Sequence, residues 1–133
     1  MKNKVAVVAA NYYENITNDL VDGVKNNLNV SFDTNTYLVD GAWEIIYKIN
    51  DLSLNDSIDK FVAIGVIIKG DTDHYEYISQ GVVDGLINLT IKNNIYIANC
   101  VLNVLNIDQA IARTKGDKNK GIEAASALNN LFV

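Results

Sequence analysis

Residues 61–78 read Phe61-Val62-Ala63-Ile64-Gly65-Val66-Ile67-Ile68-Lys69-Gly70-Asp71-Thr72-Asp73-His74-Tyr75-Glu76-Tyr77-Ile78. The first part is a continuous apolar run that ends before Lys69, and beyond His74 apolar residues recur at helical spacing. A short unbroken apolar run is typical of a parallel strand that is buried on both faces. The segment therefore predicts a strand, a turn at its carboxyl end, and a long helix.

The same alternation of strand and helix patterns runs along the whole chain. The predicted strands are Val5–Ala10, Thr36–Val39, Phe61–Ile68 and Ile95–Val104. The predicted helices are Asn15–Leu28, Ala42–Ile49, Tyr75–Lys92, Ile107–Thr114 and Gly121–Leu131. Strict alternation requires right-handed crossovers, which place helices on both faces of a parallel sheet. We therefore expect residues 1–133 to form a single α/β domain, a three-layer α/β/α sandwich with a four-stranded parallel sheet.

Composition narrows the classes of partner. The net charge of −5 argues against nucleic acid and anionic membranes, which are bound through basic patches. The chain has one cysteine, Cys100, and one histidine, so we expect neither an internal disulfide nor a metal site. Apolar neighbours predict that Cys100 is buried. Met1-Lys2-Asn3-Lys4 leads directly into a strand rather than a signal peptide, so we expect a soluble, cytoplasmic protein without a membrane span.

The turn after the third predicted strand is the first candidate site. Ligands of open parallel sheets bind outside the carboxyl ends of the strands, where the next helix offers N–H groups to an anion. Histidine is the residue type best suited to proton transfer near neutral pH, which makes His74 a candidate for acid/base chemistry on a phosphorylated molecule held by Asp71 and Thr72. The alternative is a surface histidine beside a capping box formed by Asp73 and Glu76.

Aromatic and acidic residues follow the first two predicted strands. Tyr12 can stack on a planar heterocycle; the alternative is that it packs or lies at a rim. Gly41 permits close approach, and Glu44 can accept hydrogen bonds from sugar hydroxyls. The alternative reading makes Trp43 a core residue and Glu44 a carboxylate that complements the helix dipole.

The third candidate is cationic. Arg113, the sole arginine, is followed by Lys115, Lys118 and Lys120. The arginine fork matches phosphate better than an ammonium group does. The alternative is a cation that balances the dipole at the end of a helix.

Taken together, these motifs resemble a known family. The matching segments are Gly41-Ala42-Trp43-Glu44-Ile45, residues 65–78, Ile107-Asp108-Gln109-Ala110-Ile111-Ala112-Arg113 and Asn119-Lys120-Gly121-Ile122-Glu123-Ala124-Ala125. They are similar, in order and over nearly the whole chain, to the lumazine synthase family of riboflavin biosynthesis. The G-x-T-x-H-(Y/F)-(D/E)-Y stretch is the most specific of them. The resemblance also implies a flavodoxin-like strand order.

The resemblance implies a transferase that uses no cofactor. The amine of 5-amino-6-(D-ribitylamino)uracil would condense with the ketone of 3,4-dihydroxy-2-butanone 4-phosphate. Loss of phosphate and ring closure with loss of water would then give 6,7-dimethyl-8-ribityllumazine. Catalysis would rest on holding these two small-molecule substrates together and on proton transfer.

The resemblance also assigns roles to single residues. His74 would transfer protons. The phosphate would be held by Asp71, Thr72 and Arg113. The ribitylaminouracil would be bound by Tyr12, Ala42, Trp43, Glu44, Val66, Ile67, Ile68, Asn99 and Lys120.

Assembly is implied as well. Family members form pentamers, and some close twelve pentamers into a 60-subunit shell, so we expect a homo-oligomer that is at least a pentamer. Asn99, Arg113 and Lys120 of one subunit would complete the pocket that holds His74 of its neighbour. The chain begins almost at its first strand, so we expect it to lack most of the N-terminal extension that adds a strand to an adjacent subunit. Riboflavin synthase is a candidate protein partner.

Departures from the family pattern keep a second hypothesis open. Asn11-Tyr12-Tyr13 replaces an Arg-Phe/Trp-Asn triplet, Asn99 replaces a frequent aromatic, and Ala112 replaces a frequent glutamate. These changes motivate an alternative, a weakly active or non-catalytic shell-forming protein that binds ribityl-pyrimidine or flavin ligands. A flavodoxin-like electron carrier is a third reading, but the first turn lacks the Ser/Thr-rich phosphate loop that it requires.

Overall fold

The computed structural model describes residues 3–70 and 74–133, and its central feature is the strand β3. The strands are β1 (Asn3–Ala10), β2 (Phe32–Val39), β3 (Lys60–Ile68) and β4 (Tyr96–Val104). The helices are α1 (Glu14–Lys25), α2 (Ala42–Asn55), α3 (His74–Asn93), α4 (Ile107–Ala112), the short 3-10 helix η1 (Gly116–Lys118) and α5 (Lys120–Phe132). Every side chain of β3 from Phe61 to Ile67 is buried, as its unbroken apolar run predicts.

The strands form a parallel sheet in the order β2-β1-β3-β4. This confirms the predicted four-stranded parallel sheet, and the order is the start of the flavodoxin-like arrangement. The β1–β3 ladder runs from Ala6–Phe61 to Ala9–Ile64, whereas the β3–β4 ladder continues to Ile68–Val104. The last part of β3 therefore extends past the point where its pairing with β1 ends.

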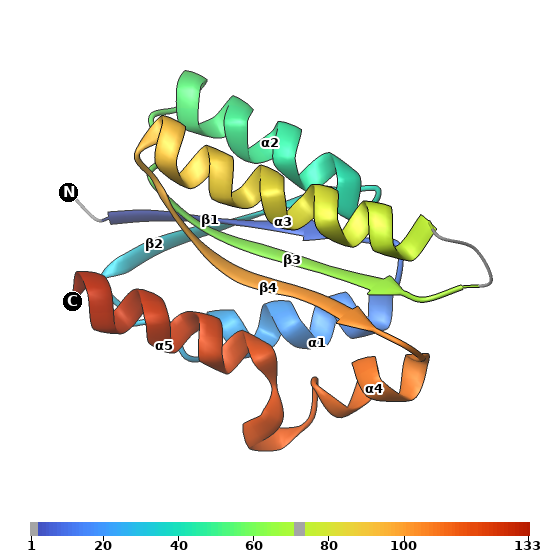
Figure 1. The fold of residues 1–133 in the computed structure, drawn as a ribbon. Coiled ribbons are helices and arrows are strands. Elements are labelled where there is room, and N and C mark those ends of the chain that lie inside the picture. The colour runs from blue at the N-terminus through green and yellow to red at the C-terminus, as the bar shows by residue number, and fades with distance from the viewer. Residues whose placement is uncertain (1–2, 71–73) are drawn as a thin grey trace.

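Helices cover both faces of the sheet, which confirms the three-layer architecture (Figure 1). The face toward α1 and α5 is packed by Leu20, Val24 and Leu128, while Ile45 and Ile49 belong to the separate core beneath α2 and α3. Each of these side chains is 0 % exposed, and full burial of one such side chain is worth roughly 1.5–3 kcal/mol. Within the described ranges, no helix combines the length and apolar character that crossing a bilayer would require.

Two predicted boundaries were wrong because tertiary contacts extend the elements. β2 begins at Phe32 rather than at Thr36, since the mixed stretch Phe32–Asn35 gains its order by pairing with β1, from Asn3↔Phe32 to Ala6↔Asn35. α2 continues to Asn55 rather than ending at Ile49, because Leu52 is buried in the core beneath it.

Smaller differences lie at the helix ends. α1 ends at Lys25, and Leu28 follows in a turn in which its amide donates to the carbonyl oxygen of Val24 at 3.0 Å. α4 ends at Ala112 rather than at Thr114, and η1 lies in the cationic segment between α4 and α5.

The start of α5 lies very close to the middle of α1. A Cβ added to Gly121 would collide with the Leu20 carbonyl oxygen and would lie 2.9 Å from the Val24 amide nitrogen. Both of these are backbone atoms, which cannot move aside without shifting α1. Glycine at position 121 is therefore required by the helix packing rather than by its own backbone angles.

Cys100 lies in β4 and is 1 % exposed, as the sequence predicts. Burial raises the pKa of its thiol to about 12; the nearby charges of Lys120 and Glu123 act in opposite directions. The side chain therefore behaves as a small apolar group at neutral pH.

We expect Gly121→Ala to destabilise the protein by about 1–3 kcal/mol, the usual cost of overpacking. Alanine is the better helix former by about 1 kcal/mol, so a loss of stability would run against intrinsic propensity. Urea denaturation measures the change. Gly70→Ala is the control, because among the described residues no heavy atom beyond the chain neighbours lies within 4 Å of a Cβ there. Equal stability of Gly121→Ala and wild type would contradict the close approach.

We expect the free energy of unfolding of Cys100→Ala to fall less than that of wild type as the pH rises into the alkaline range. The folded-state pKa lies above the unfolded value of about 8.5, so the contribution of the thiol is complete below that pH and is lost as pH rises toward 12. The free energy of unfolding of wild type should therefore fall more steeply above pH 9 than that of the variant. Tyr13 and Tyr96, whose pKa values burial also raises, are present in both proteins and cancel in the comparison. Parallel curves would show that Cys100 ionises without restraint.

Candidate functional site

Several of the candidate residues lie near the edge of the sheet where all four strands end. β1 ends at Ala10, β2 at Val39, β3 at Ile68 and β4 at Val104. Because the strands are parallel, the turns that follow them meet at this one edge, on the right of Figure 1. Tyr12 and Trp43 are therefore brought toward the same end of the molecule as His74, although they are far apart in sequence.

His74 is the first residue of α3, and its side chain is exposed. The predicted phosphate residues Asp71 and Thr72, and the predicted cap Asp73, lie outside the described residues. Glu76 forms an ion pair with Lys69 at 3.3 Å, with both side chains about half exposed. This pair links the first turn of α3 to the end of β3.

The end of β3 offers backbone groups at the same edge. Val66 and Ile67 are buried, Ile68 is half-buried, and the Lys69 amide donates to the Val104 carbonyl oxygen at 2.9 Å. In the described part of the chain, the pairing of β3 with β1 stops at Ile64. The backbone groups of β3 after Ile64 that face the β1 side are therefore not part of that ladder. A planar ligand with donors and acceptors on one edge could pair with them.

The turn after β1 is held by a buried hydroxyl group. Thr17 is 0 % exposed, and its Oγ1 donates to the Ala10 carbonyl oxygen at 2.7 Å. The Asn11 amide donates to the Val39 carbonyl oxygen at 2.8 Å. Tyr12 is 76 % exposed and meets Tyr13 edge to face, with ring centroids 4.9 Å apart. Tyr12 is therefore a rim aromatic on a fixed turn, whereas Tyr13 packs against the core.

The start of α2 approaches the sheet closely because of two glycines. A Cβ at Gly65 would lie 3.3 Å from Ile45 Cδ1 and 3.6 Å from Ala42 Cβ, and a Cβ at Gly81 would lie 3.1 Å from the Trp43 ring. Trp43 is 59 % exposed, so the alternative reading of it as a core residue is wrong. Its ring lies over α3 instead.

Glu44 is an exposed first-turn acid of α2, and its carboxylate lies beside Gly41 at the helix start, where it complements the helix dipole. Trp43 and Glu44 both line a groove of about 640 Å³ between α2 and α3.

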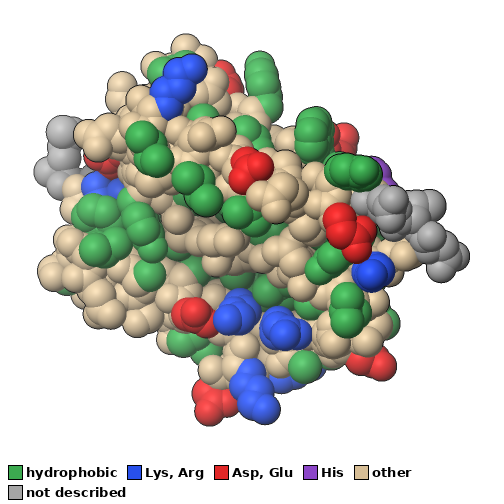
Figure 2. Space-filling view, in the orientation of Figure 1, with side chains coloured by type: hydrophobic (Ala, Val, Ile, Leu, Met, Phe, Trp, Pro, Cys, Tyr) green, Lys and Arg blue, Asp and Glu red, His purple; other side chains and the backbone are tan. Residues whose placement is uncertain are grey.

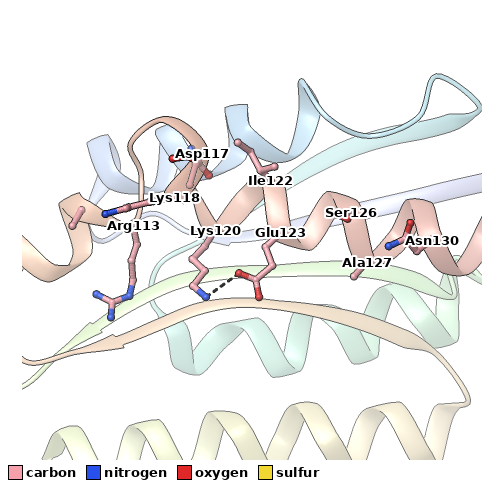
Figure 3. Close-up of a pocket in the computed structure, with 11 residues that line it drawn as sticks. Arg113, Asp117, Lys118, Lys120, Ile122, Glu123, Ser126, Ala127 and Asn130 are labelled. Atoms are coloured by element: carbon pink, nitrogen blue, oxygen red, sulfur yellow. Dashed lines mark hydrogen bonds and ion pairs between the residues drawn. The ribbon is translucent and has the colours of Figure 1, made fainter.

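Arg113 and Lys120 line one cavity of about 930 Å³ at the junction of α4, η1 and α5. Their side chains project to the same side of the loop (Figure 3). Figure 2 shows lysine and arginine side chains gathered on this part of the surface, with acidic side chains beside them. Arg113 Nη1 donates to the Gln109 carbonyl oxygen at 2.8 Å, and Lys120 Nζ pairs with Glu123 Oε2 at 2.9 Å.

The Arg113 contact agrees with the alternative that this residue balances the end of α4, and it also restrains the guanidinium. A guanidinium has five N–H donors, and the hydrogen bond to Gln109 engages Nη1. The other N–H groups of the Arg113 guanidinium can donate to an anion. The half-buried side chain that carries them is anchored by the bond to Gln109.

Asn99 lies on the edge strand β4 with its side chain exposed. Its Oδ1 accepts a hydrogen bond from the Val101 amide at 3.0 Å. The side chain is thus turned along its own strand.

The candidate residues fall into two groups on opposite layers of the molecule. His74 and Trp43 belong to the α2/α3 layer, and Arg113 and Lys120 to the α1/α5 layer. His74 is not among the described residues that line the cavity of Arg113 and Lys120. The described residues therefore present two candidate partial sites rather than one pocket shared by His74 and Arg113.

Two residues that support the cationic group were missed from the sequence. The Gln109 side chain accepts from the Leu105 amide through Oε1 at 2.7 Å, and its backbone carbonyl oxygen accepts from Arg113. Asn119 is buried and bonds to three backbone groups. Neither position has a pattern of its own, since a lone amide in a polar loop ordinarily indicates a turn or a cap.

Comparison with known proteins is consistent across the chain. The model of the family described as 6,7-dimethyl-8-ribityllumazine synthase matches residues 2–132. A protein of that name from Limosilactobacillus reuteri is 36% identical, over 98% of this chain and 88% of its own length. The protein of that name from Bdellovibrio bacteriovorus is 40% identical, over 98% of this chain and 74% of its own length. The one from Pediococcus pentosaceus is 32% identical, over 96% of this chain and 85% of its own length.

Proposed function

The chain belongs to the 6,7-dimethyl-8-ribityllumazine synthase family, and from this premise we propose that it makes 6,7-dimethyl-8-ribityllumazine. The substrates are 5-amino-6-(D-ribitylamino)uracil and 3,4-dihydroxy-2-butanone 4-phosphate, and phosphate and water are released. The match over residues 2–132 is the observation that carries the proposal. The relatives carry the name of a synthase, which favours an enzyme over a protein that only binds ribityl-pyrimidine ligands.

The reaction needs proton transfer and positioning. The pyrimidine amine forms a bond to the ketone carbon, and loss of water gives an imine. Loss of a proton from the carbon beside the imine then lets the carbon–oxygen bond to phosphate break, and ring closure releases a second water. The reaction therefore moves one proton off carbon and others between nitrogen and oxygen, and a histidine side chain is suited to such transfers near neutral pH. We assign this role to His74, at the carboxyl edge of the sheet. The proposal involves no cofactor.

The phosphate is proposed to bind at Arg113, together with the Asp71 backbone and the Thr72 hydroxyl. The support on the described residues is the anchored, half-buried guanidinium beside Lys120. A bidentate guanidinium–phosphate pair fixes the leaving group as well as its charge.

The pyrimidine substrate is proposed to bind along the sheet edge. Tyr12 would stack on the ring, and the backbone of Val66, Ile67 and Ile68 would pair with the ring edge. Ala42, Trp43 and Glu44 would line the ribityl chain, with Asn99 and Lys120 completing the ring pocket. The exposure of Tyr12 and the early end of the β1–β3 ladder support these roles.

We propose that a second copy of the chain completes the site. His74 and Arg113 lie on opposite layers, so a neighbour that brings its Arg113 and Lys120 to this His74 would join the two partial sites. Exposed apolar side chains on the outer faces of α2 and α3 support such an interface: Tyr47, Tyr77, Ile87 and Ile91 are 75 %, 74 %, 53 % and 77 % exposed. The assembly is proposed to be a pentamer or a 60-subunit shell of pentamers.

We also propose that this protein acts in the cytoplasm and that residues 1–133 form a single lumazine-synthase-like domain. Riboflavin synthase is a candidate protein partner. The net charge of −5 supports small-molecule substrates rather than nucleic acid.

The assay of lumazine formation from the two substrates tests the proposal. Arg113→Ala should raise KM for the phosphorylated substrate at least about tenfold, because a charge-assisted hydrogen bond is worth roughly 1.5–3 kcal/mol. Lys25→Ala, which removes an exposed cation at the end of α1, is the control for charge. Wild-type protein that binds the pyrimidine but forms no product would establish the binding-protein alternative instead.

His74→Ala should slow kcat by about 10²–10⁴ without abolishing turnover. Some rate remains because the two substrates are still held together. Stopped-flow measurement of product formation at saturating substrate reports kcat directly. An unchanged kcat would remove His74 from the chemical step.

Light scattering tests the assembly. We expect a particle with at least five times the mass of the monomer, since one chain alone separates His74 from Arg113. A monomer in solution that retains full activity would refute the shared site.

A further inference from the structure

The loop that connects α4 to α5 is clamped to α1 at one residue. Asn119 is 9 % exposed, and its Nδ2 donates to the Asp19 carbonyl oxygen at 3.0 Å and to the Thr114 carbonyl oxygen at 3.1 Å. Its Oδ1 accepts from the Gly121 amide at 2.7 Å. One buried side chain therefore joins α1, the end of α4 and the start of α5.

The surrounding glycines leave room for this one side chain. A Cβ at Gly23 would collide with Asn119 Oδ1 and would lie 2.8 Å from its Nδ2. Gly121 likewise admits no Cβ, as described above. The Asn119 amide group thus sits in a slot between α1 and α5, where small shifts of the loop are resisted by packing as well as by hydrogen bonds.

The two cations of the cavity flank this clamp. Arg113 precedes the loop and Lys120 follows it, and the Lys120 amide donates to the Arg113 carbonyl oxygen at 2.9 Å. While the Asn119 bonds are intact, Thr114 and Lys120 stay close to each other. Thr114 is adjacent to Arg113, so the backbone of Arg113 stays close to that of Lys120 as well. The clamp therefore restrains the backbone positions from which the Arg113 guanidinium and the Lys120 ammonium group reach one cavity.

We propose that Asn119 is a positioning residue that sets the placement of Arg113 relative to Lys120, and thereby the binding of the phosphorylated substrate. This inference rests on the proposed function. Asn119 acts through the loop, since its own polar atoms are directed to backbone groups.

The chain offers a matched control at the other end of α5. Asn129 also joins α5 to the segment after α1: its Oδ1 accepts from the Asn29 amide and its Nδ2 donates to the Asn27 carbonyl oxygen, both at 2.9 Å. Asn129→Ala removes a similar set of bonds without touching the loop of Arg113 and Lys120.

Steady-state kinetics on the assembled protein test the proposal with Asn119→Ala, Asn119→Asp and Asn129→Ala. Asn119→Asp keeps an oxygen for the Gly121 amide, and so the cap of α5, but loses both donor contacts. Both Asn119 variants should raise KM for 3,4-dihydroxy-2-butanone 4-phosphate at least about tenfold, since a misplacement of about 1 Å can cost on the order of a hundredfold. Asn129→Ala should keep the wild-type KM. If Asn119→Ala does not fold, Asn119→Asp decides the question.

A double-mutant cycle separates positioning from general destabilisation. In an Arg113→Ala background, Asn119→Asp should change KM for the phosphorylated substrate less than twofold, because the group that it positions is gone. An undiminished effect in that background, or a wild-type KM in Asn119→Asp alone, would overturn the inference while leaving the proposed function intact. Absence of lumazine from the wild-type protein would overturn the proposed function, and this inference with it.

Discussion

A parallel strand buried on both faces needs helices on both sides of the sheet, and the rest of this structure depends on that requirement. β3 is such a strand, with β1 on one side and β4 on the other. Covering it demands one helix layer of α1 and α5 and another of α2 and α3. Parallel strands also end together, so the starts of α1, α2 and α3 lie at a single edge of the sheet.

Close helix contacts then decide where the functional groups lie within that frame. Gly65 and Gly81 let the start of α2 settle against the sheet and α3, which places the Trp43 ring over α3. Gly23 and Gly121 do the same for α1 and α5, which leaves a slot for Asn119. In both layers a glycine on one helix leaves room for a candidate side chain from another element: Gly81 for Trp43 and Gly23 for Asn119.

The two helix layers on opposite faces of the sheet keep the two groups of candidate residues apart. His74 begins α3, on one face of the sheet, and Arg113 follows α4, beside the other helix layer, so one chain holds two candidate partial sites. In the proposed assembly, the apolar side chains left exposed on α2 and α3 supply the surface for a second copy. Assembly and catalysis are thereby coupled in the proposed function, since the interface that covers apolar surface also joins the acid/base group to the phosphate group.

Much of the fold could be predicted because its signals are local. The apolar run of β3 and the helical spacing after His74 are visible in sequence, and they determine the element types and the parallel sheet. The start of β2 could not be predicted in this way, because Phe32–Asn35 is ordered by pairing with β1 rather than by its own composition. The extension of α2 to Asn55 likewise depends on Leu52 finding a place in the core.

For the candidate site, the sequence by itself determined which residue types follow each strand, since motif and strand end lie next to each other in the chain. Only the tertiary structure decided that Trp43 lies on a surface and that Arg113 shares a cavity with Lys120. It alone showed that Asn119 clamps their loop to α1. The physical reason is that such placements arise from contacts between residues far apart in the chain, such as Trp43 with Gly81 and Asn119 with Asp19, and no local pattern records them.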